Sequence, residues 1–116
     1  MNSFLAVKAN MLEMLKYSQI EFSEYEKTKN EVKLQQSGEK LFNVFCRYLE
    51  IRYKTTTNTH NEIRYLANAD SRNRNLLDRL ELLHEYFYHS TKFEADQAAL
   101  RYRELLKQVK QRVERL

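Results

Sequence analysis

One helical segment of the sequence carries the residue types that proton transfer and phosphate chemistry use. Arg79 and His84 lie five positions apart, and Tyr86 follows two positions later. An imidazole can take and give a proton near neutral pH, and a guanidinium can hold a phosphate through two parallel hydrogen bonds. Five residues on a helix separate two side chains by about 140° around the axis. Arg79 and His84 could therefore act on one phosphate only across a groove, or if a two-fold dimer places a second pair opposite.

The same residues have a structural interpretation, which the spacing alone favours. His84 falls in the apolar stripe of its helix, so it would pack as an amphipathic core residue. Arg79 would then be a solvated charge and Tyr86 a packed aromatic. The other histidines, His60 at a helix start and His89 at a helix end, have no ligand partner at metal spacing.

Other catalytic and cofactor motifs are missing from the sequence. It contains no glycine-rich phosphate loop and no H-E-x-x-H, C-x-x-C or G-x-S-x-G pattern. We therefore expect no metal and no cofactor. The single cysteine, Cys46, lies among Phe42, Phe45 and Leu49 at helical spacing, which favours core packing over a nucleophilic role.

The composition predicts an all-α fold in a single domain, residues 1–116. The chain has no proline and one glycine, Gly38, so the residues that β-hairpin turns need are almost absent. Apolar residues make up 42% and charged residues 31%, as in a globular domain. No apolar stretch approaches the length of a membrane span, and the N-terminus interleaves polar and charged residues with its apolar ones, unlike a secretory signal. We expect a cytoplasmic protein with no membrane contact.

Apolar residues at three- and four-residue spacing predict four main helices and one short bridging helix, packed as an antiparallel up-and-down bundle. The first helix ends near 24–28. A polar loop at 54–58 precedes a short helix that begins at His60, and a polar run at 68–75 predicts the turn before the fourth helix.

Local signals mark several helix starts and one close helix contact. S/T-x-x-E capping boxes begin at Thr28, Thr59 and Thr91. Gly38 lies inside the apolar stripe of the second helix, where the missing side chain would let another helix approach closely.

The positive charge of the chain is concentrated in its last helix. The formal net charge is +4, and residues 101–116 hold six basic side chains against two acidic ones. A helical wheel places them on two flanks of the apolar stripe: Arg101, Arg112 and Arg115 on one, Arg103, Lys107 and Lys110 on the other. The candidate nucleic-acid contacts among them are Arg101, Arg103, Lys107 and Lys110. A solvated surface is the alternative interpretation, and an acidic partner would fit the same charges.

Three segments resemble the HEPN domain, a small helical bundle found in prokaryotic toxins, defence systems and nucleotidyltransferase partners. Residues 35–42, QQSGEKLF, are similar to the Q-A-x-E-K signature of that family. Thr59-His60 resembles the T-H that opens its third helix, and residues 79–86, RLELLHEY, fit the R-x-x-x-x-H-x-Y form of its active-site motif. The resemblance covers about residues 3–115.

The resemblance implies a metal-independent ribonuclease of toxin or defence type. His84 would assist removal of the 2′-hydroxyl proton, and Arg79 would stabilise charge on the phosphate, with the pairs of a homodimer facing each other. Single-stranded RNA would be the substrate. The implied partner is a nucleotidyltransferase antitoxin, and Tyr86 resembles the tyrosine that such enzymes adenylylate.

A second branch of the family gives the alternative. Residues 83–89, LHEYFYH, also resemble the L-H-x-x-F-[HY] element of archaeal PaREP-like proteins, for which ribonuclease activity is not established. Active HEPN ribonucleases commonly have Asn, Asp or His after the arginine, whereas this chain has Leu80. The alternative is a catalytically inactive module that dimerises or binds a partner. An open cleft lined by Arg79 and His84 of both protomers would favour the nuclease, whereas a buried His84 with its nitrogens bonded inside one protomer would favour the binding module.

Overall fold

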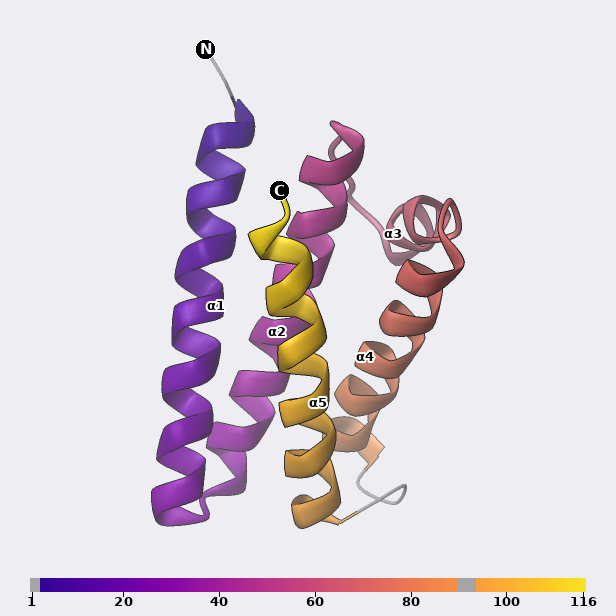
Figure 1. The fold of residues 1–116 in the computed structure, drawn as a ribbon. Coiled ribbons are helices and arrows are strands. Elements are labelled where there is room, and N and C mark those ends of the chain that lie inside the picture. Colours follow the sequence, from indigo (N-terminus) through magenta and orange to yellow (C-terminus); the bar gives the residue numbers. More distant parts are fainter. Residues whose placement is uncertain (1–2, 90–93) are drawn as a thin grey trace.

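The structure is an all-α bundle, as the composition predicts. The computed structural model describes residues 3–89 and 94–116, which form α1 (Ser3–Thr28), α2 (Glu31–Tyr53), α3 (His60–Ala67), α4 (Ser71–His89) and α5 (Ala95–Glu114). In Figure 1, α1, α2, α4 and α5 run in alternating directions along the long axis, and the short α3 connects α2 to α4. Within the described part of the chain, no helix combines the length and hydropathy that crossing a bilayer requires.

Helix α2 lies at the centre of the core. It contacts each of the other helices, and buried side chains run along most of its length. Leu34, Leu41 and Leu49 are completely excluded from solvent. Because burying one such leucine side chain is worth about 1.5–3 kcal/mol, these contacts fix α2 between its neighbours.

Gly38 marks a close contact between α1 and α2, as the sequence predicts. Gly38 is buried, and beside it the Ser18 hydroxyl of α1 donates a 2.7 Å hydrogen bond to the Ser37 carbonyl of α2. This bond uses the only hydroxyl proton of Ser18, so the Tyr102 hydroxyl of α5, 2.7 Å away, is the donor to Ser18. Phe22 stacks on the Tyr102 ring at 4.3 Å. Side chains of α1, α2 and α5 therefore meet at one buried hydrogen-bonded chain.

A buried carboxylate holds the predicted loop between α2 and α3. Glu50 is 1% exposed and accepts hydrogen bonds from the Thr57 amide at 2.8 Å and the Thr57 hydroxyl at 2.7 Å. Arg47, one turn earlier on α2, pairs with the other carboxylate oxygen. A buried charge needs such partners, so the two hydrogen bonds from Thr57 fix the loop against the end of α2.

One predicted helix cap is confirmed and one is wrong. The Thr59 hydroxyl accepts from the Glu62 amide at the start of α3, as the capping box predicts. Thr28, however, is the last residue of α1, and its hydroxyl donates to the Glu24 carbonyl. Asn30 caps α2 instead. A threonine in a helix can bond to the carbonyl four residues back, which leaves the cap position to a later polar residue.

The fourth and fifth helices begin at positions that the sequence places only roughly. The turn before α4 comprises residues 68–70, because Asp70 accepts from the Arg72 amide at 2.9 Å and caps the helix. That bond and the charge of Arg72 lower the pKa of Asp70. Helix α5 has Glu94 at its cap position, and the predicted start at Thr91 lies outside the described residues.

Cys46 is a core residue, as its sequence neighbours predict. Its side chain is 4% exposed, and burial raises the pKa of the thiol from 9.0 to about 12. Burial also raises the pKa of Tyr102. A protonated thiol with a high pKa is a weak nucleophile at neutral pH.

We expect the fold to lose stability as the pH rises above about 9. The Cys46 thiol ionises near its ordinary pKa in the unfolded chain, but stays protonated in the fold until about pH 12. The unfolded state then binds fewer protons, so the free energy of unfolding falls with pH, by at most about 1.4 kcal/mol per pH unit from this group. Urea unfolding over this pH range measures the slope. A Cys46→Ala variant with the same alkaline slope as the wild type would contradict the assignment.

Candidate nucleic-acid interface

The structure places Arg79 and His84 on different sides of α4. His84 is partly buried, and its ring stacks on Phe42 of α2 with the ring centroids 5.4 Å apart. Arg79 is exposed and faces α5, where it lines a hollow together with Arg101. The angle of about 140° between the two positions thus directs them to different neighbours. His84 lines neither of the hollows that Arg79 lines.

The surroundings of His84 are those of a packed aromatic cluster. Phe42 also contacts the ring of His60, at the start of α3, with centroids 5.7 Å apart. Two imidazoles therefore contact one buried phenyl ring where α2, α3 and α4 meet. Among the residues that the structure describes, no three His, Cys, Asp or Glu side chains are grouped so that they could hold a metal ion. The side chains of Tyr86 and His89 lie outside the described residues.

A groove follows the contact between α4 and α5. It consists of three adjoining hollows of about 730, 560 and 210 Å³. The first and second share Arg72 and Arg112, and the second and third share Arg79. We call the whole the seam groove, and its first and largest hollow the end cavity.

The seam groove is strongly basic. Of the described residues that line it, seven are cationic and three are acidic, an excess of four positive charges. The cationic residues are Lys8, Arg52, Arg72, Arg79, Arg101, Arg112 and Arg115. The acidic residues are Asp70, Asp78 and Glu104. Such a concentration of one sign of charge in a concave surface attracts anions.

Two of the three carboxylates already have cationic partners. Asp78 accepts a 3.0 Å hydrogen bond from Arg64 of α3, which also pairs with Glu81. Asp70 accepts from the Arg72 amide, and its carboxylate lies 3.6 Å from the Arg72 side chain. These contacts reduce the negative charge that the carboxylates present to the groove.

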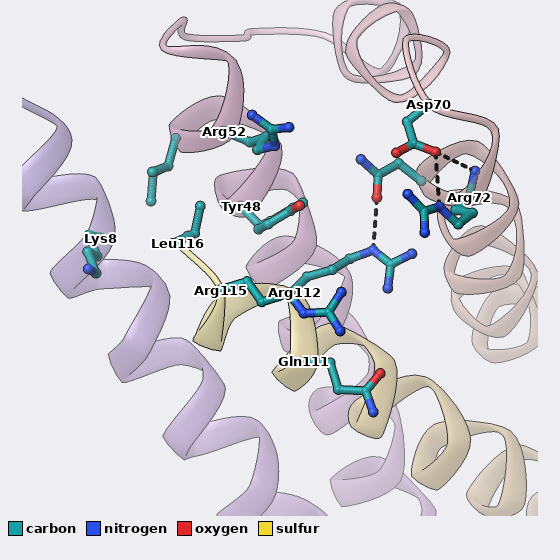
Figure 2. A pocket seen from close by; sticks show the side chains of 11 residues that line it. Lys8, Tyr48, Arg52, Asp70, Arg72, Gln111, Arg112, Arg115 and Leu116 are labelled. Carbon is teal, nitrogen blue, oxygen red and sulfur yellow. Dashed lines mark hydrogen bonds and ion pairs between the residues drawn. The ribbon is translucent and has the colours of Figure 1, made fainter.

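Figure 2 shows the end cavity, with Arg52, Arg72 and Arg112 reaching into the space between α2, α4 and α5. The Arg112 Nε donates a 2.8 Å hydrogen bond to the Oδ1 of Asn73, which is 4% exposed. This bond to a buried amide positions the guanidinium of Arg112 at the junction of the first two hollows.

The structure divides the four predicted nucleic-acid contacts. Arg101 lines the seam groove, whereas Arg103, Lys107 and Lys110 line a fourth hollow on the other flank of α5, which shares only Gln111 with the end cavity. Arg103 is also engaged there, because it pairs with Glu26 at 2.8 Å. The two flanks predicted by the helical wheel are thus confirmed, and one of them belongs to the seam groove.

No pattern in the sequence indicates Lys8, Arg52 or Arg72 as candidates. They lie on three different helices, and no short motif connects them. Their positions in the bundle do carry a signal, because Arg52 is in the last turn of α2 and Arg72 is in the first turn of α4. In an up-and-down bundle these two helix ends lie together, beside the C-terminal end of α5.

Comparisons of the chain with protein-family models, with curated proteins and with solved structures gave no match. The resemblance to the HEPN domain therefore rests on the three sequence segments alone. The candidate interface rests on the shape and charge of the seam groove.

Proposed function

We propose that this chain is an RNA-binding helical module that holds single-stranded RNA in the seam groove. The observation that carries the proposal is the excess of four positive charges along three adjoining hollows. Arginines would contact the phosphates, and the apolar side chain of Leu82, which is 41% exposed and lines the third hollow, would contact a base. The resemblance to the HEPN domain supports RNA as the nucleic acid.

Arg79 and His84 of one chain line no common hollow, so binding is the role proposed for the single chain. A ribonuclease of the R-x-x-x-x-H type needs both side chains at one phosphate. In this chain His84 stacks on Phe42 and lines neither of the hollows that Arg79 lines. For cleavage, a second copy of the chain would have to place its His84 beside Arg79, or its Arg79 beside His84. The homodimer and the nucleotidyltransferase antitoxin belong to this ribonuclease hypothesis.

Salt-dependent RNA binding tests the proposal. A short fluorescent single-stranded RNA, titrated with the chain at several salt concentrations, should bind with an affinity that falls steeply with salt. Four phosphate contacts give a slope of log K against log salt of about −3. Absence of binding at low salt would overturn the proposal and leave an acidic protein surface as the ligand for the groove.

A cleavage assay separates binding from catalysis. Wild type and His84→Ala are incubated in parallel with a mixed pool of single-stranded RNA, without metal. We expect the RNA to be recovered intact from both reactions. Cleavage by the wild type but not by His84→Ala would overturn the binding-only role and establish the ribonuclease hypothesis.

A further inference from the structure

We propose that the end cavity is a site for a phosphate monoester, where the terminal phosphate of an RNA strand in the seam groove binds. The placement of the RNA strand rests on the proposed function. The monoester site itself rests on three features of the end cavity: the four helices that line it, its charge and its fixed arginine.

More helices contribute to the end cavity than to the rest of the seam groove. The described residues that line the second and third hollows all belong to α4 and α5. The end cavity is also lined by Lys8 of α1 and by Tyr48, Ile51 and Arg52 of α2. A strand that follows the seam therefore meets the ends of two further helices at this point, which suits the end of a strand better than its middle.

Charge is also most concentrated in the end cavity. Five of the seven cationic residues of the seam groove line it, against one acidic residue, Asp70. A terminal phosphate carries about 1.5 to 2 negative charges at neutral pH, whereas each phosphate inside a strand carries about one. The group with the larger charge gains more from this cavity.

Arg112 is held in position by contacts within the protein. Its side chain donates to the buried Asn73 at 2.8 Å and to the Gln108 carbonyl at 3.5 Å. A guanidinium has five N–H donors, so these two contacts leave donors for a ligand. Arg72 faces the same space in Figure 2. An arginine that is already fixed loses little freedom on binding, which favours a bidentate contact with a phosphate.

The test compares RNA strands that differ only at their ends. Internally labelled strands of one sequence carry a 5′-phosphate, a 3′-phosphate or two hydroxyl ends, and their affinities are measured by fluorescence anisotropy. We expect one of the phosphorylated strands to bind at least about tenfold more tightly than the hydroxyl-ended strand, the effect of about one charge-assisted hydrogen bond.

A double variant assigns the preference to the end cavity. Arg52 and Arg115 are exposed and line only the end cavity among these hollows, so Arg52→Gln with Arg115→Gln should reduce the preference to about twofold or less. Lys107→Gln with Lys110→Gln removes the same charge from the other flank of α5 and should keep the preference. Thermal unfolding checks that both variants fold. Equal loss of the preference in both variants would overturn the assignment.

The outcomes distinguish this inference from the proposed function. If the wild type binds all three strands equally, the monoester site is wrong and RNA binding stands. If it binds no RNA, the proposed function is wrong, and calorimetry with a nucleoside monophosphate decides the site separately. If the nucleoside monophosphate binds the wild type but not the Arg52→Gln, Arg115→Gln variant, the monoester site is supported. If it does not bind the wild type, the monoester site is wrong.

Discussion

Reversing the charges of Arg79 and Arg101 should weaken RNA binding about a hundredfold or more. Both side chains are exposed and line the same hollow of the seam groove, one from α4 and one from α5. A charge-assisted hydrogen bond to a phosphate is worth about 1.5–3 kcal/mol, and a glutamate at the same position repels the phosphate. The measurement is the RNA affinity of Arg79→Glu with Arg101→Glu at one fixed salt concentration, because affinity depends strongly on salt.

The matched control changes the same amount of charge on the other flank of α5. Lys107 and Lys110 line none of the three hollows of the seam groove, so Lys107→Glu with Lys110→Glu should weaken RNA binding much less. Salt limits the reach of surface charges to about 10 Å, which restricts the effect of these residues on the seam groove. Equal losses from the two double variants would show that RNA responds to net charge alone, and would contradict the seam groove as the interface.

The fold could be predicted from the sequence because local patterns determine most of it. The spacing of apolar residues shows which faces are buried, and the polar residues at 54–58 leave nothing for a helix to bury there. The errors fall at helix ends. Thr28 and Asn30 both suit a cap, and the choice between them depends on backbone geometry around Lys29, which adopts a left-handed φ of 59°. The S/T-x-x-E capping-box pattern does not specify that backbone geometry.

The candidate interface could be predicted only in part, because it is assembled from separate helices. The helical wheel of α5 separates Arg101 from Lys107 and Lys110, and the structure confirms this separation. Which flank faces α4 depends on how the helices pack. The contributions of Arg52 and Arg72 depend on the same packing, since these residues meet only where the ends of α2 and α4 come together.

The spacing of Arg79 and His84 allows two interpretations, and the tertiary contacts show that the two side chains have different neighbours. His84 falls in the apolar stripe of α4, and in the structure it stacks on Phe42 of α2. Arg79, on another side of α4, belongs to a groove that includes α5. A motif written as letters and gaps does not say which neighbouring helix each of its residues faces, and that information decides whether two side chains share a substrate.

Glu50 connects the stability of the bundle to the shape of the end cavity. Replacing Glu50 with alanine should lower the free energy of unfolding by about 3 kcal/mol or more. The substitution removes the acceptor of both Thr57 hydrogen bonds and leaves Arg47 without its carboxylate partner. Urea unfolding followed by circular dichroism measures the loss. Glu50→Gln keeps the side-chain size and one acceptor oxygen, so it should lose less stability than the alanine variant.

The exposed Glu13 of α1 provides the control, since Glu13→Ala should change the free energy of unfolding by less than about 0.5 kcal/mol. A loss below about 1 kcal/mol for Glu50→Ala would contradict the view that this carboxylate organises the loop.

The position of Glu50 also predicts an effect on the end cavity. Arg52 follows it in the last turns of α2 and lines the end cavity, so local loosening at Glu50 should also reduce the preference for a terminal phosphate. Glu13→Ala should leave that preference unchanged, because Glu13 does not line the end cavity.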